Sequence, residues 1–213
     1  DGSKRQVEKG SSILKIARQI SEGLARNATA GRVDGKVEDL RFPINKDCKL
    51  EILTFDDEDG KKAYWHTSSH IMAQAIKRLY KDIQLAIGPS IDAGFYYDFD
   101  TEYRFSEEDF AKIEEEMKKI IKEDLPIERF ELPRNEALEL MKDEPYKVEL
   151  INDLAEDEII SFYKIGDFTD LCAGPHVMSL KNIKAVKLLR SAGAYWKGDA
   201  NNHVMQRIYG VCF

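Results

Sequence analysis

Two short segments of this chain carry the residue types that most often do chemistry in proteins. His66 and His70 are four positions apart, at the head of an apolar periodic stretch that predicts a helix from about Thr67 to Tyr80. Residues i and i+4 share one face of a helix, with Cβ atoms roughly 5–6 Å apart. Cys172 and His176 repeat the same four-residue spacing, and the two segments hold three of the chain's 4 histidines. We therefore expect the two segments to meet and to form one hydrolytic site.

The second pair has a different local setting from the first. Gly174-Pro175 separates Cys172 from His176. Proline lacks a backbone donor and glycine disfavours a helix, so this stretch predicts a loop or the end of a strand.

These groups allow two kinds of hydrolytic chemistry and one structural role. Three imidazoles and a thiol have the ligand types and number of a tetrahedral zinc site, which lowers the pKa of a bound water to about 7 when one position is open. In the metal-free alternative a histidine, with an ordinary pKa of about 6.5, acts as general base for water. The other imidazoles and a nearby lysine or aspartate would then position the substrate and stabilise the oxyanion, and Lys147 and Asp170 are candidates. In the third alternative, the residues only stabilise the fold.

Other conspicuous residues have simpler interpretations. Tyr96 and Tyr97 lie in an aromatic stretch that is typical of a core strand, and His203 lies in a polar, turn-like run. Cys48 and Cys212 have no companions and receive no role. The sequence contains neither a G-x-x-x-x-G-K loop nor a G-x-S-x-G elbow, so nucleotide-dependent and serine-hydrolase chemistry are not supported.

Composition limits the class of protein. The chain has 213 residues, of which 43% are hydrophobic, which suits one large domain or two small ones. Its 3 widely spaced cysteines give no disulfide framework, which favours a reducing compartment and hence a cytoplasmic location. We expect neither a membrane span nor a secretory signal. The net charge of -7 argues against a generic nucleic-acid coat, although basic residues gather near both ends.

The first sixty residues predict a small β-grasp, ubiquitin-like domain, with its first strand missing. The pattern is a helix among short strands, with a hairpin turn at Asp34-Gly35. An unpaired sheet edge would leave this unit marginally stable. The acidic, turn-rich segment Asp56–Gly60 is interpreted as a linker. The expected elements are strands at 4–8, 29–33, 36–37 and 49–55 and a helix at 13–26.

Residues 61–213 predict a larger domain in which helices and strands mix without regular βαβ alternation. The class we expect for the whole chain is therefore α+β. Ser106 followed by Asp109 has the spacing of a capping box at the start of one helix. The expected helices span 67–80, 107–123, 133–142 and 146–154, and the expected strands span 94–99, 127–132, 159–165, 186–192 and 205–211.

Six motifs follow one another along the chain: His66-x3-His70, Ala86-Ile87-Gly88-Pro89, Gly94-Phe95-Tyr96-Tyr97-Asp98, Tyr146-Lys147-Val148, Asp170-x-Cys172-x-Gly174-Pro175-His176 and Gly193-Ala194-Tyr195-Trp196-x-Gly198-Asp199. Taken together, they closely resemble the N-terminal region of bacterial-type threonyl-tRNA synthetases. Any one motif is weak, but their order along the whole chain is specific. By this resemblance residues 1–60 are a TGS domain and residues 61–213 an editing domain, shared more distantly with alanyl-tRNA synthetase.

The resemblance implies hydrolysis of mischarged seryl-tRNA(Thr). Serine lacks one methyl group of threonine, and such a difference gives only about 1–3 kcal/mol of discrimination, so a synthetic site sometimes charges serine. A second pocket must then remove serine and reject threonine. The resemblance implies that Lys147 and His66 handle the attacking water and that Tyr97 and Asp170 place the seryl group and terminal adenosine. The residues implied to line the pocket are His66, His70, Cys172 and His176.

The resemblance also sets expectations about cofactors and partners. It implies a metal-free editing pocket, with zinc bound by His66, His70, Cys172 and His176 as the alternative, as in alanyl-type sites. ATP and a separate zinc belong to the aminoacylation domain, which these residues do not contain. The expected partner is the acceptor end of tRNA(Thr) carrying serine, and the full-length protein is expected to dimerise through other domains. A non-catalytic tRNA-binding module remains a further alternative.

Overall fold

The computed structural model describes all residues from 1 to 213 and confirms the α+β class. Its contacts divide the chain into two compact units. The first comprises Asp1–Tyr64 with Gly174–Met178, and the second comprises Trp65–Ala173 with Ser179–Phe213. A domain boundary at residue 60 stays a prediction. None of the helices has the length and apolar character needed to cross a membrane.

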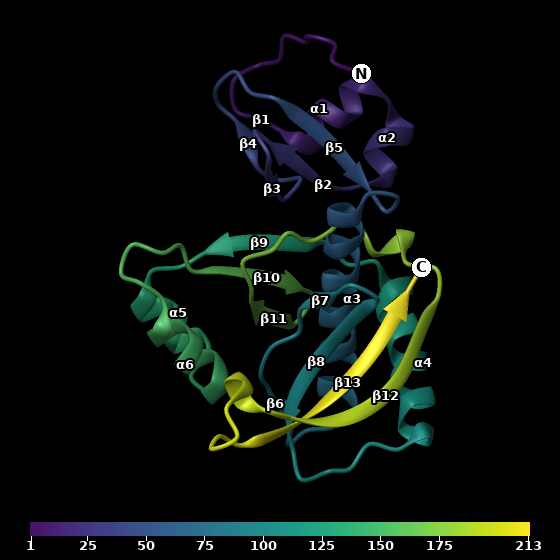
Figure 1. Ribbon diagram of the computed structural model, residues 1–213, viewed down its shortest axis with the longest axis vertical. Coiled ribbons are helices and arrows are strands. Elements are labelled where there is room, and N and C mark those ends of the chain that lie inside the picture. Colours follow the sequence, from purple (N-terminus) through teal and green to yellow (C-terminus); the bar gives the residue numbers. More distant parts are fainter. The chain divides into compact units, whose positions relative to one another are not determined.

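The first unit is built on a three-stranded antiparallel sheet in the order β3-β2-β5 (Figure 1). Two further short strands, β1 and β4, pair with each other. Apolar side chains of the first helix, Ile13 and Ile16, pack with Leu40 and Ile44 to form the core. The elements are β1 (Ser11–Ser12), α1 (Ile13–Ile20), α2 (Glu22–Asn27), β2 (Ala28–Val33), β3 (Lys36–Glu38), β4 (Pro43–Ile44) and β5 (Leu50–Thr54).

The structure corrects two sequence predictions in this unit. The expected strand at 4–8 is absent, and the first strand is β1. The single helix expected at 13–26 is broken at Ser21, whose backbone is extended, with a φ of -164°. The Ser21 hydroxyl accepts a hydrogen bond from Leu24 N at 3.0 Å and so caps a second helix. Serine at a helix N-cap is favoured for this reason, which explains the break.

The acidic segment interpreted as a linker is instead the entry to the long helix α3 (Glu58–Leu79). Asp57 accepts a hydrogen bond from Thr54 N at 2.7 Å, which shapes a turn before the helix. At Gly60 an added Cβ would lie 2.0 Å from the Thr54 carbonyl oxygen, so this position requires glycine. His66 therefore lies in the interior of α3, and not at its head as the predicted start at Thr67 implied.

The second unit contains two antiparallel sheets and several helices. One sheet has the order β12-β13-β8-β6, with β7 also paired to β8, and the other has the order β11-β10-β9. The strands are β6 (Gln84–Leu85), β7 (Ser90–Ile91), β8 (Gly94–Asp100), β9 (Ile127–Glu131), β10 (Ser161–Ile165), β11 (Phe168–Leu171), β12 (Val186–Tyr195) and β13 (Val204–Cys212). The helices are α4 (Glu107–Glu123), α5 (Arg134–Leu140) and α6 (Pro145–Asp153), with single 3-10 turns at Leu180–Asn182 and Trp196–Gly198.

Figure 1 shows β8, β13 and β12 running side by side, as their pairing requires, with α4 near β12. The Leu188 amide of β12 donates to Glu114 of α4 at 2.8 Å. Alternate residues of β8, Phe95, Tyr97 and Phe99, are fully buried. Alternation places such residues on one face of a strand. This face supplies one of the groups of the candidate site described next.

Candidate active site

Helix α3 presents His66 and His70 on one face, as their spacing predicted. Their ring centroids lie 5.1 Å apart in an edge-to-face arrangement. His70 is buried, with 3% of its surface exposed. His66 is partly exposed, so one side of this pair is open to solvent.

Cys172 follows directly after β11 and begins an irregular loop, which confirms the predicted setting of the second pair. Its amide donates to the Ser161 carbonyl at 3.0 Å, and the Ser161 hydroxyl donates back to the Cys172 carbonyl. The backbone at Cys172 is therefore held by β10. Cys172 Sγ lies 3.3 Å from His66 Nε2, a hydrogen-bonding distance for a thiol and an imidazole.

His176 is held through its backbone by an ion pair of the first unit. The His176 amide donates to Asp39 Oδ2 at 3.1 Å, and Arg41 donates to the His176 carbonyl at 3.3 Å. Asp39 and Arg41 are themselves paired at 3.0 Å. Sequence reasoning missed both residues, because Arg41 and His176 are 135 positions apart and no spacing rule connects them.

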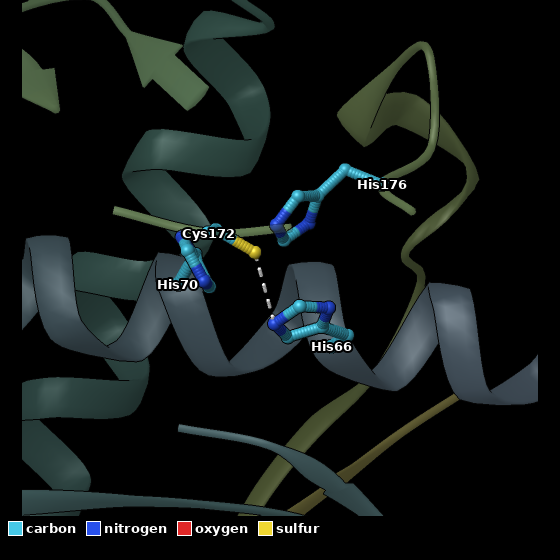
Figure 2. Close-up of side chains that lie close together, drawn as sticks. All are labelled: His66, His70, Cys172 and His176. Carbon is cyan, nitrogen blue, oxygen red and sulfur yellow. Dashed lines mark hydrogen bonds between the residues drawn. The ribbon is translucent and has the colours of Figure 1, made fainter. Parts of the chain in front are cut away.

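The four side chains converge (Figure 2). Their potential ligand atoms all lie within 4.8 Å of one another, so His66, His70, Cys172 and His176 could hold a metal ion. Three imidazole nitrogens and one sulfur fit the donor preferences of zinc. We call this group the His/Cys cluster.

A buried charged network lies next to the His/Cys cluster. Lys147 Nζ is 2.8 Å from Asp170 Oδ1, and both side chains are almost fully buried, with 3% and 1% exposed. Tyr97 donates its hydroxyl hydrogen to Asp170 Oδ2 at 2.7 Å, and Lys147 donates to the Tyr97 oxygen at 3.0 Å. His70 Nδ1 lies 3.5 Å from Asp170 Oδ2, which joins the network to the cluster.

Burial and charge shift the protonation of these groups. Burial lowers the pKa of His70 to about 4; Asp170 opposes this shift and Lys147 adds to it. His70 is therefore neutral at pH 7. Burial alone would raise the pKa of Asp170, but the Lys147 ammonium and His70 lower it below its ordinary value. Burial and the Asp170 carboxylate raise the pKa of Tyr97 well above its ordinary value.

The structure thus brings together all seven residues singled out from the sequence. Tyr97 is a core residue, as interpreted, and its hydroxyl also belongs to the buried network. His203, Cys48 and Cys212 lie outside the cluster. His203 is 58% exposed and pairs with Asp100 at 2.7 Å. A hollow of about 330 Å³, bordered by Arg104, Ser191 and Gln206 among others, shares no residue with the site.

Comparisons with known proteins agree with this geometry. Residues 1–54 match the TGS domain family. Residues 160–209 match the family described as the threonyl and alanyl tRNA synthetase second additional domain. The second match includes Asp170, Cys172 and His176 of the candidate site.

Several curated relatives match along the whole chain. A threonine--tRNA ligase of Clostridium perfringens (strain 13) is 67% identical over 213 residues, covering 100% of this chain and 33% of the relative. One of Clostridium botulinum (strain Eklund 17B) is 66% identical with the same coverage. One of Clostridioides difficile (strain 630) is 62% identical over 215 residues, covering 100% of this chain and 34% of the relative.

The chain spans about a third of the length of these ligases. The remaining two thirds, which include the aminoacylation domain, have no counterpart in these residues. This chain matches the N-terminal third of threonine--tRNA ligases and carries their TGS and editing domains.

Proposed function

We propose that this chain hydrolyses the ester bond of seryl-tRNA(Thr) and so proofreads the product of a threonine--tRNA ligase. The observation that carries the proposal is the convergence of the His/Cys cluster with the Lys147–Asp170–Tyr97 network. The cluster is open on the side of His66 and Cys172 and closed on the side of His70 and His176. An ester can approach the open side while charged groups act from the buried side.

His66 is the group we assign as general base for the attacking water. Its imidazole is the one in the cluster with partial exposure, and Nε2 lies 3.3 Å from Cys172 Sγ. An imidazole within hydrogen-bond reach of a water can take a proton from it as general base.

His70 has a different role because it is neutral. A carboxylate beside Nδ1 favours the tautomer that carries its proton there, since Nδ1–H can then point to Asp170. Nε2 of His70 is then an acceptor. It can receive a hydrogen bond from the attacking water or from the serine hydroxyl without adding charge to the pocket.

The Lys147 ammonium supplies the electrostatic part of the mechanism, and the Tyr97 hydroxyl, which donates its hydrogen to Asp170, accepts from Lys147 and helps to hold it. Negative charge develops on the carbonyl oxygen as water attacks, and prearranged donors in a water-poor site stabilise it. Asp170 holds Lys147 Nζ in place, at 2.8 Å from Oδ1. In the proposed complex this network also places the seryl group and terminal adenosine.

The first test measures release of serine from seryl-tRNA(Thr) by the purified chain, with threonyl-tRNA(Thr) as the comparison substrate. Serine should be released well above the spontaneous rate. Threonyl-tRNA should react at least about tenfold more slowly, because a tight pocket must exclude one additional methyl group. Serine release no faster than buffer alone would rule out this activity for the chain.

Two matched histidine variants locate the chemistry. His66→Ala should reduce hydrolysis roughly 10²–10⁴-fold, the usual contribution of a general base. His203→Ala removes an exposed imidazole whose contact is with Asp100, outside the cluster, and should leave the rate unchanged. Equal rates for the His66 variant and the unsubstituted chain would remove His66 from the mechanism.

The second candidate function is a zinc-dependent hydrolysis of the alanyl-editing type. The observation in its favour is that the ligand atoms of the His/Cys cluster lie within 4.8 Å of one another. Bound zinc would supply Lewis-acid activation of water there. Metal analysis of the purified chain, and hydrolysis rates with and without a chelator, decide between the two chemistries. Activity of metal-free protein would contradict the zinc alternative.

The partner of the proposed activity is the acceptor end of tRNA(Thr). Contacts with phosphates would make binding fall steeply as salt rises. Binding of tRNA without any serine release would favour a non-catalytic module over either hydrolase. A cytoplasmic location and dimerisation of the full-length protein stay predictions.

A further inference from the structure

Glu144 lies immediately before α6, three residues ahead of Lys147. Its carbonyl oxygen accepts hydrogen bonds from Lys147 N at 3.0 Å and from Val148 N at 3.1 Å. These are the first hydrogen bonds of the helix. Pro145 stands in its first turn, and because proline has no backbone N–H it leaves no donor unpaired there. The position of Glu144 therefore sets where α6 begins and from where the Lys147 side chain extends.

The carboxylate of Glu144 connects this start to two other elements. Glu144 Oε1 accepts from Lys77 Nζ at 2.6 Å, and Oε2 accepts from the Leu85 amide of β6 at 3.0 Å. Both charged side chains are mostly buried, with 33% of Lys77 and 17% of Glu144 exposed. Lys77 Nζ also donates to the Ile83 carbonyl at 3.0 Å, so the ammonium is held on two sides.

Lys77 belongs to the same helix as His66 and His70 of the His/Cys cluster. It follows His70 by seven residues, which is almost two turns of an α-helix and so returns to the same face. One carboxylate thus connects the face of α3 that carries His70 to the first turn of α6 that carries Lys147. Glu144 is not itself a member of the His/Cys cluster.

We propose that Glu144, through its ion pair with Lys77, is a positioning residue that sets the distance between Lys147 and the histidines of α3. The inference rests on the proposed function for its kinetic consequences. The physical reason is the short range of the contacts made by Lys147, 2.8 Å to Asp170 and 3.0 Å to Tyr97. A displacement of α6 by about 1 Å would lengthen both, and a misplacement of this size can cost about 10²-fold in rate.

Two variants remove the connection with little change in volume. Glu144→Gln keeps an oxygen that can accept from Leu85 N but loses the charge that pairs with Lys77. Lys77→Met keeps most of the aliphatic stem and removes the ammonium. Each should lower kcat for seryl-tRNA(Thr) hydrolysis roughly ten- to a hundredfold, with KM within about twofold, because neither residue is placed to touch substrate.

Lys142→Met is the matched control. Lys142 forms an ion pair of the same chemistry with Glu139, at 2.7 Å, a few residues before α6. That pair is exposed, with 61% of Lys142 and 73% of Glu139 open to solvent, and it joins two residues only three positions apart. Its loss should leave kcat and KM unchanged.

A second measurement reads the position of Lys147 without any substrate. A buried, hydrogen-bonded ammonium exchanges slowly with water, so Lys147 should give an NMR correlation between its side-chain protons and ¹⁵N, assigned by its loss in Lys147→Met. The signal should shift or disappear in Glu144→Gln and Lys77→Met and persist in Lys142→Met.

If both Glu144→Gln and Lys77→Met keep this signal and the kcat of the unsubstituted chain, even with a lower melting temperature, Glu144 is only structural and the proposal is wrong. If the unsubstituted chain releases no serine, the proposed function fails, and the NMR signal alone decides the positioning role.

Discussion

Lys147→Met is the substitution for which the structure makes the sharpest stability prediction. Methionine fills most of the volume of the lysine stem, so the change is chiefly the loss of one buried positive charge. It leaves the Asp170 carboxylate buried, with the Tyr97 hydroxyl at 2.7 Å and His70 at 3.5 Å as its remaining partners. In the unsubstituted chain His70 is neutral at pH 7, with a pKa of about 4, and burial, the largest cause of this shift, remains when Lys147 is replaced.

The expected magnitude follows from the burial of the pair. Only 3% of the Lys147 side chain and 1% of the Asp170 side chain are exposed. Removing one partner of a buried ion pair costs about 3–5 kcal/mol, because the other charge is left uncompensated. We therefore expect the free energy of unfolding to fall by this amount at pH 7.

The fall in the free energy of unfolding caused by Lys147→Met should become smaller as the pH is lowered. With Lys147 present, the folded pKa of Asp170 is below its unfolded value, so the carboxylate stabilises the fold above about pH 4 and this stabilisation is lost below. In the variant, burial without the ammonium raises the folded pKa above the unfolded value. The carboxylate then destabilises the fold at neutral pH and protonates as pH falls. The difference between the two proteins should therefore shrink from pH 7 toward pH 4.

Urea unfolding followed by tryptophan fluorescence measures this difference. Trp65 and Trp196 are both buried in the second unit, with 8% and 5% exposed, so they report on the part of the chain that holds the pair. Lys142→Met, which removes an exposed ammonium, is the control and should change little. A loss below about 1 kcal/mol for Lys147→Met at pH 7, or a loss that does not change with pH, would refute the reasoning.

Two further predictions concern packing and capping. Gly88→Ala should unfold at lower temperature and lose hydrolysis, because the added Cβ would lie 2.1 Å from the Tyr97 ring; a melting temperature and rate equal to those of the unsubstituted chain would contradict this contact. Burial would raise the pKa of Asp109, but hydrogen bonds from Ser106 and two tyrosine hydroxyls lower it to about 2. Its folded pKa is thus below the unfolded value, so it should contribute about 2 kcal/mol above pH 4 that is lost as pH falls through 2. Unfolding free energies of Asp109→Asn and the unsubstituted chain should converge between pH 4 and pH 2, and a constant gap would argue against the shift.

Local sequence determined those features that depend on neighbouring residues. The helix predicted at 107–123 coincides with α4, because the Ser106 and Asp109 pair forms its capping box and apolar residues recur at helical spacing. His66 and His70 share a helix face for the same reason of periodicity. The loop at Cys172–His176 follows from glycine and proline, which disfavour regular structure there. Motif order along the chain also indicated the TGS and editing domains, which the comparisons confirm.

Only the tertiary structure decided how these pieces combine. The break at Ser21 and the entry of α3 at Glu58, by contrast, come from hydrogen bonds between residues three positions apart, which the helical pattern alone does not reveal. Lys147 was named in the sequence as one of two candidates, but its burial against Asp170 depends on contacts between residues 147 and 170 that no local pattern encodes. The connection of Glu144 to Lys77 spans 67 positions. Such contacts form when distant segments pack around a shared core, and the free energy that selects them comes from burial of the whole domain, whereas helix periodicity and caps act within a few residues.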